Sequence, residues 1–134
     1  MGKLSQLRGT LKNKMVNFTR IKISIDATTK LQTLKGRTGL TPNILSRIAL
    51  CYSLNKSNIT DLVPFDDLGQ EFNRHTFMGE YDSIIAALVR EKCILEGLDP
   101  EKDFLSVFNA HLNNGIMAIY ARVKNISDFT NLME

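Results

Sequence analysis

The sequence predicts a mainly α-helical protein, a compact domain of about five helices with a short strand near its N-terminus. Proline-led helix starts at Pro42 and Pro100, and an apolar face at helical spacing between residues 79 and 95, predict the helices. Isoleucines that alternate with polar residues predict the strand. With 134 residues, 43% of them hydrophobic, the chain can form one core, and no apolar run is long enough to cross a membrane.

Residues 1–18 are interpreted as a basic arm that is flexible or weakly helical. Leu4, Leu7 and Leu11 have helical spacing, but glycines and an asparagine within the segment weaken a helix. The arm carries four cations and no acid, and it lacks the apolar block and cleavage site of a secretory signal. We therefore expect a cytoplasmic protein, in which the two cysteines stay reduced.

Residues 19–25 are predicted to form the short strand, because isoleucine alternates with a polar residue throughout. The isoleucines are expected to face the core, while Arg20, Lys22 and Ser24 point outward. No second segment offers an equally clear strand, so pairing with another subunit is one solution for its open edge. An ordinary edge strand with a basic outer face is the alternative.

Two helices follow the strand. Asp26 is the expected N-cap of the first helix, which ends near Arg37 with Gly39 as its left-handed C-terminal residue. A Thr-Pro start at Pro42 begins the second helix, which runs to about Leu54. Strand, helix, tight turn and helix is the order of a ribbon-helix-helix module, so the N-terminal part is predicted to be ribbon-helix-helix-like.

The rest of the chain is predicted to alternate between loops and helices. Residues 55–75 are polar and broken, so we interpret them as a long surface connection. A third helix runs from about Gly79 to Leu95. Its core-facing side is expected to comprise Tyr81, Ile84, Ile85, Leu88 and Val89. A fourth helix begins at Asp99-Pro100 and is interrupted at Asn113–Gly115, before a last short helix to Val123. The predicted organisation is a basic arm at 1–18, a single helical domain at 19–124 and a frayed tail at 125–134.

The charge is distributed unevenly along the chain. Residues 1–50 hold ten Lys or Arg and one acid, a charge of +9, whereas the remainder holds seven Lys or Arg and thirteen acids, a charge of −6. Such segregation favours a polyanion partner for the N-terminal third, with nucleic acid the leading class. A solvated basic face, or pairing with the acidic region of a neighbouring subunit, remains an open alternative.

Candidates for catalysis are weak. Glu71 and His75 lie four residues apart, so a metal site that nicks DNA is conceivable if the segment is helical. Glu80 and Asp82 lie nearby, but no HExxH, CxxC or EF-hand pattern is present, and a loop of solvated charges is the interpretation we adopt. His111 lies on an apolar helix and is interpreted as structural. We predict no catalytic residue, no metal ligand and no cofactor.

Two stretches resemble a known family. KLQTLKGRTGLTPNILSRIAL (Lys30 to Leu50) is similar to the signature of DndE, a small protein of bacterial DNA phosphorothioation systems. DLGQEFNRHTFMGEYD (Asp67 to Asp82) resembles that family's Glu-Phe-Asn segment and the Gly-Glu opening of its third helix. The similarity covers about Arg20 to Arg122.

The resemblance implies a component, not demonstrably enzymatic, that binds duplex DNA with a preference for nicks and assembles as a homotetramer. Its partners would be a cysteine desulfurase and the sulfurtransferase-like and ATPase components of DNA phosphorothioation. An adaptor that docks onto those components, with incidental DNA contact, is the alternative function. The predicted contacts to the DNA backbone are Arg20, Lys22, Lys30, Lys35, Arg37, Asn43 and Arg47, together with N–H groups at the helix start at Pro42.

Overall fold

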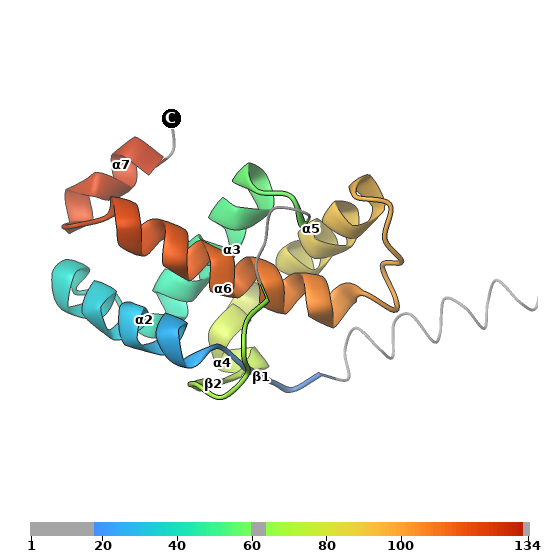
Figure 1. Ribbon diagram of the computed structural model, residues 1–134, viewed down its shortest axis with the longest axis horizontal. Coiled ribbons are helices and arrows are strands. Elements are labelled where there is room, and N and C mark those ends of the chain that lie inside the picture. Colours follow the sequence, from blue (N-terminus) through green and yellow to red (C-terminus); the bar gives the residue numbers. More distant parts are fainter. Residues whose placement is uncertain (1–17, 60–63, 133–134) are drawn as a thin grey trace, which may run out of the picture.

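The computed structural model describes residues 18–59 and 64–132 (Figure 1). This part of the chain is mainly helical with a short N-terminal strand, as predicted, and the strand belongs to a small antiparallel sheet. The predicted arm, apart from Phe18, lies outside the described residues. In chain order the elements are β1 (Arg20–Lys22), α2 (Ile25–Thr38), α3 (Pro42–Lys56), β2 (Glu71–Asn73), α4 (Arg74–Met78), η2 (Gly79–Tyr81), α5 (Asp82–Leu95), α6 (Phe104–Arg122), η3 (Ile126–Asp128) and α7 (Phe129–Leu132).

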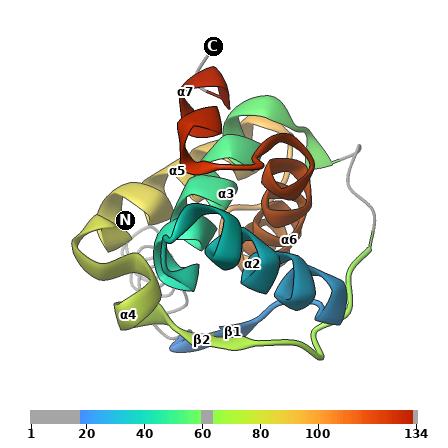
Figure 2. The same cartoon turned by 90° about the vertical axis from the view of Figure 1, so that its left-hand side faces the viewer.

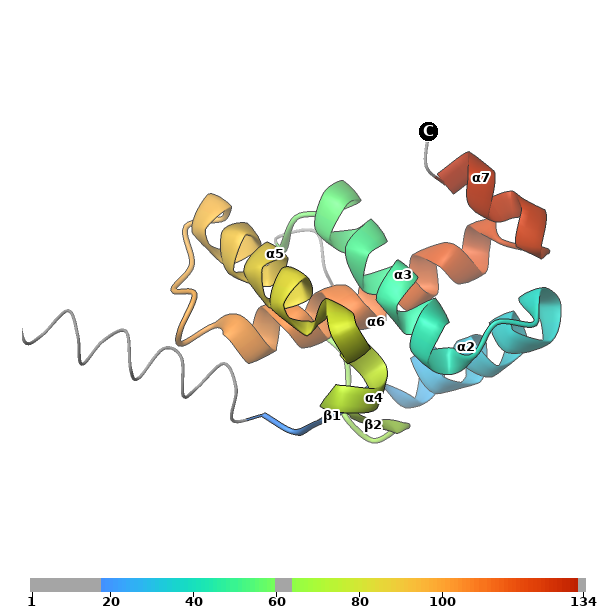
Figure 3. The ribbon, with the colours of Figure 1, turned by 180° about the vertical axis from the view of Figure 1, so that it is seen from behind.

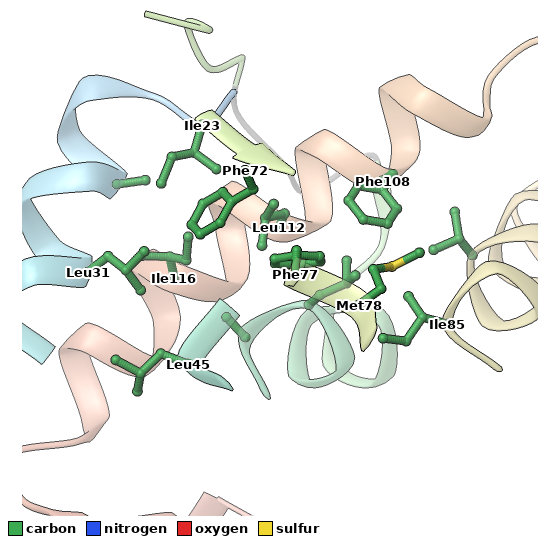
Figure 4. Close-up of a cluster of buried hydrophobic side chains, with 14 of the residues drawn as sticks. Ile23, Leu31, Leu45, Phe72, Phe77, Met78, Ile85, Phe108, Leu112 and Ile116 are labelled. Carbon is green, nitrogen blue, oxygen red and sulfur yellow. The ribbon is translucent and has the colours of Figure 1, made fainter. Parts of the chain in front are cut away.

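The core forms around α6, which crosses the molecule and packs most extensively against α3 and then against α2. Apolar side chains from these helices, from both strands' ends and from α4 and α5 meet there (Figure 4). Gly115 lets α3 and α6 approach closely, because a Cβ built on it would lie 1.9 Å from the Ala49 carbonyl oxygen. The labelled members of this cluster are Ile23, Leu31, Leu45, Phe72, Phe77, Met78, Ile85, Phe108, Leu112 and Ile116.

The strand finds its partner within the same chain. β1 pairs antiparallel with β2, and Ile21 lies opposite Phe72. Our interpretation of residues 55–75 as a surface connection missed β2, because three residues are too few for a periodic pattern to emerge. Gly69 extends the pairing, since its N–H donates to the Ile23 carbonyl oxygen at 2.8 Å, and a Cβ there would collide with Ser24 and Thr28. Pairing between subunits is therefore unnecessary for β1.

The first helix begins two residues earlier than predicted. Its N-cap is Ser24, whose buried hydroxyl accepts a hydrogen bond from the Ala27 N–H at 3.0 Å. Ile25 is 55% exposed, so the predicted alternation of buried isoleucines ends at Ile23. The expected N-cap, Asp26, lies instead in the first turn, where a carboxylate also favours the helix.

The fourth helix differs from its prediction at both ends. Asp99 does not cap α6; its carboxylate accepts from the N–H groups of Glu101 and Lys102 in a turn, and α6 starts at Phe104. The helix then continues through Asn113–Gly115 to Arg122 without a break. Glycine and asparagine disfavour a helix only weakly, and here each makes a tertiary contact that offsets this preference.

The C-terminal residues form η3 and α7 where we expected a frayed tail. Asn125 and Asp128 form a capping box, and the Leu132 side chain is buried. Among the described residues, none of the helices combines the length and the apolar character that crossing a membrane requires.

Candidate DNA-binding surface

At one end of the molecule the C-termini of α2 and α6 lie close together beside α7, at the left in Figure 1 and toward the viewer in Figure 2. Three cations surround the half-buried Tyr120 ring there. The distances from the ring centre are 4.6 Å for the Arg37 guanidinium, 5.1 Å for Lys30 Nζ and 5.6 Å for Lys124 Nζ. We call these four residues the Tyr120 cluster. The electron-rich ring faces lower the repulsion between the cations and hold them together.

Arg37 has a structural task within this cluster. Its Nη1 donates to the carbonyl oxygens of Tyr120 at 3.1 Å and Val123 at 3.3 Å. These carbonyls belong to the last turn of α6 and its C-cap, where helix geometry leaves acceptors unpaired. Arg37 therefore joins α2 to the end of α6 and adds a positive charge where the helix dipole favours one.

The other cations predicted on α2 and β1 differ in accessibility. Lys22 and Lys35 are exposed. Lys30 donates to the Asp26 carboxylate at 2.6 Å, and Arg20 donates to that of Glu71 at 3.0 Å. Both of these pairs are partly exposed, so solvent screens them, and a phosphate could compete with either carboxylate.

Two predicted contacts lie on α3. Arg47 reaches toward α4, where its Nε donates to the Phe77 carbonyl oxygen and its guanidinium lies 5.7 Å from the Tyr81 ring centre. Asn43 is half-buried in the first turn of α3. Thr41 caps that helix, which has no acidic residue in its first turn, so its N–H groups remain suited to an anion. The structure thus separates Arg47 from the Tyr120 cluster.

Three residues of this end were missed from the sequence. Lys124 was the last residue of the predicted domain, and no role was predicted for Tyr120 or for Arg122, which lies 5.7 Å from the Tyr52 ring centre. The available signal was the grouping of Arg122 and Lys124 at a helix C-terminus, a position that cations favour. The sequence could not show that this C-terminus lies beside that of α2, because the approach of the two helices depends on tertiary packing.

The weak metal candidates are drawn into ion pairs. Glu71 pairs with Arg20, and Asp82 accepts two hydrogen bonds from Arg74, at 2.7 and 2.8 Å. Over residues 18–59 and 64–132, no three His, Cys, Asp or Glu side chains lie close enough together to hold a metal ion.

The ionisable groups with shifted pKa values lie away from the cationic end. Burial lowers the pKa of His111, whose Nδ1 lies 2.8 Å from the Ser53 hydroxyl. Partial desolvation raises the pKa of Cys51, although the residue is exposed, and burial with nearby carboxylates raises that of the buried Cys93 to about 11. Neither thiol is therefore poised as a thiolate.

Fold and surface together define a small helical protein with a cationic end built where two helix C-termini meet. Residues 20–127 match the family model described as DNA sulphur modification protein DndE. The chain therefore belongs to the DndE family, as the resemblance of its two sequence stretches predicted. No curated protein matches it.

Two similar crystal structures show the same fold. DndE from Escherichia coli B7A, involved in DNA phosphorothioation modification, is 25% identical with a TM-score of 0.59. A Gly-to-Lys mutant of DndE, involved in DNA phosphorothioation, is 24% identical with a TM-score of 0.58. Each match covers 76% of this chain and 97% of the other. The first 19 residues of this chain precede the part that the family model matches.

Proposed function

We propose that this protein is the DNA-binding component of a DNA phosphorothioation complex and that it contacts the duplex backbone through its cationic end. The observation that carries the proposal is the Tyr120 cluster, where three cations converge and the Asp26 carboxylate pairs with one of them, Lys30. Lys35 adds an exposed positive charge in the last turn of α2. Membership of the DndE family supports DNA as the polyanion.

Contacts of this kind hold phosphates without reading bases, so binding should be independent of sequence and should weaken steeply with salt. We further propose that nicked duplex binds more tightly than intact duplex. A nick interrupts one strand and makes the site easier to bend, so DNA can follow a protein surface at a lower deformation cost.

Salt titrations of affinity for a nicked and an intact duplex test both statements. The double variant Lys35→Gln, Lys124→Gln changes two exposed lysines of the cationic end. If each contacts a phosphate, the slope of log affinity against log salt should fall by about 0.9 per lysine. Lys102→Gln is the matched control, since Lys102 is exposed before the start of α6, at its opposite end. An unchanged slope in the double variant would refute the proposed surface.

The adaptor function is favoured by one observation. Arg20, Arg37 and Arg47 already bond within the fold, which leaves fewer side chains for phosphate than the sequence predicted. In the adaptor proposal the basic face binds acidic surfaces of the cysteine desulfurase, sulfurtransferase-like or ATPase components. A pull-down of those components after nuclease treatment separates the two functions, because only protein-to-protein contacts survive the nuclease.

We propose that the protein acts as a homotetramer and has no nuclease activity of its own. Light scattering across a concentration series measures the assembly state, and a monomer mass throughout would exclude the tetramer. Glu71 and Asp82, the carboxylates of the conceivable nicking site, are held by Arg20 and Arg74. Supercoiled plasmid should therefore stay uncut with Mg²⁺ or Mn²⁺, and conversion to open circles would contradict this.

A further inference from the structure

An apolar groove of about 840 Å³ is lined mainly by residues of α3, α5 and α7. Figure 3 shows how these three helices are arranged. The α5 wall of the groove was predicted to face the core, yet only Ile85 and Val89 of that face are buried. Tyr81, Ile84 and Leu88 are 45%, 61% and 45% exposed. Together with Ile44 and Cys51 of α3, they form a concave apolar surface of the kind that binds a partner.

We propose that this groove is filled by the N-terminal segment of the same chain, residues 3–15, docked as an amphipathic helix. This inference goes beyond the proposed DNA binding and does not depend on it. Leu4, Leu7 and Leu11 recur at the spacing with which helices insert side chains into apolar grooves, and Met15 continues the series. A leucine stripe of this kind needs an apolar surface to cover it, and the groove is one.

The lengths of the two surfaces match. Leu4 and Leu11 would lie roughly two helical turns apart, which is also about the separation along the groove wall between Tyr81, the residue before α5, and Leu88 of α5.

The segment is tethered near the groove. The described chain begins at the buried Phe18, whose carbonyl oxygen accepts a hydrogen bond from Arg74 at 3.4 Å. The same guanidinium holds the carboxylate of Asp82, the first residue of α5. Tyr81, the residue before it, lines the groove. The segment therefore leaves the fold about one arginine side chain from the beginning of α5, which gives it a high effective concentration at the groove.

Charge favours the same placement. The segment carries four cations and no acid. Glu91 is exposed on α5, and it shares a face with Leu88 and Ile84 because it follows them by three and seven residues. Glu80, which is also exposed, adjoins Tyr81. Both carboxylates therefore lie near the groove wall, where they can attract the cations of the segment. Arg47, the cation that lines the groove, is already bonded to the Phe77 carbonyl oxygen.

Cys51 is a native probe for this contact. It is exposed and lines the groove, whereas Cys93 is buried. We would measure the rate at which a thiol reagent modifies Cys51 in the full chain and in a chain that begins at Phe18, both with Cys93→Ala. A segment docked about nine-tenths of the time protects the thiol about tenfold, so truncation should raise the rate by that factor.

Four further measurements test whether the protection depends on the leucines of the segment and on the groove. Leu4→Ser, Leu7→Ser, Leu11→Ser should match the truncation, whereas Lys3→Gln, Lys12→Gln, which keeps the leucines, should retain most of the protection. A peptide of residues 1–17 added to the truncated chain should restore protection, and Ile84→Ser, Leu88→Ser should abolish that effect. These two side chains are largely exposed, so their replacement leaves the core intact.

Equal modification rates in the full and truncated chains, with both folded by circular dichroism, would overturn the proposal. Protection that disappears on dilution of the full chain would also overturn it, because a second copy would then occupy the groove. Since no DNA is present in this assay, its failure is distinct from failure of the proposed DNA binding.

Discussion

Gly115 and Gly36 show how differently two glycines act within helices. Gly115 lies where α6 presses against the backbone of α3, whereas a methyl group added to Gly36 would meet no neighbouring atom within 4 Å. Close packing against another helix therefore requires glycine at position 115 but not at position 36. The helix interior would favour alanine at both.

We expect Gly115→Ala to lower the free energy of unfolding by at least about 2–3 kcal/mol, since the added methyl must displace backbone. Gly36→Ala, the matched control, should raise it by about 0.5 kcal/mol because it restricts the unfolded chain. Urea denaturation measures both. A Gly115→Ala protein as stable as the parent would mean that α3 and α6 lie further apart than described.

His111 gives the protein a pH dependence of stability. Burial disfavours its charged form and lowers its pKa from the usual 6.5, so the unfolded chain binds the proton more readily. Stability should therefore fall as the pH decreases below about 6.5, and continue to fall until the folded pKa is passed. His111→Gln should flatten this slope. Denaturation midpoints between pH values of about 7.5 and 5 compare the two proteins, and parallel slopes would contradict the assignment.

At the scale of elements, the start of α2 depends on contacts from distant parts of the chain. Asn113 of α6 accepts the Ser24 N–H at 2.8 Å, and the Asp66 carboxylate accepts that of Ile25 at 3.1 Å. These bonds satisfy donors that the first turn of a helix leaves unpaired. They also explain why Ser24 caps the helix in place of Asp26, although both residue types are good N-caps.

Ser24→Ala should therefore lower stability by about 1 kcal/mol, the usual loss for an N-cap. Asp26→Ala removes a surface pair with Lys30 and a favourable charge in the first turn, and should cost less, about 0.5 kcal/mol. Thermal unfolding of the two variants tests which residue caps α2. A larger loss of stability in Asp26→Ala than in Ser24→Ala would show that Asp26 caps α2, as the sequence predicted.

At the scale of the whole molecule, the C-terminal residues complete one wall of the groove and one side of the cationic end. α7 contributes Phe129 and Leu132 to the groove, while Lys124 stands beside Tyr120. The charge segregation seen along the sequence is partly cancelled in space, because Glu71 of the acidic part pairs with Arg20 of the basic part.

Deletion of residues 125–134 should lower the free energy of unfolding by about 2–3 kcal/mol, because Leu132 loses its buried contacts. A frayed tail would contribute nothing. Chemical denaturation of the shortened chain decides between these values, and retention of Lys124 keeps the charge of the Tyr120 cluster unchanged.

The sequence by itself determined the helical class, the limits of α2 and α3 to within about two residues, and the family. These depend on local signals, namely the Thr41-Pro42 start, the Gly39 stop and the motif that spans them. It also determined which N-terminal residues carry positive charge. Such features are encoded by neighbouring residues, so a single chain segment is enough to reveal them.

Only the tertiary structure decided what these elements meet. It paired β1 with β2, carried α6 through Gly115, and brought Lys124 to Tyr120 beside Arg37. It also left Ile84 and Leu88 exposed, although their spacing predicted a core face. Periodicity shows which side of a helix is apolar, but whether that side is covered depends on segments far away in the chain.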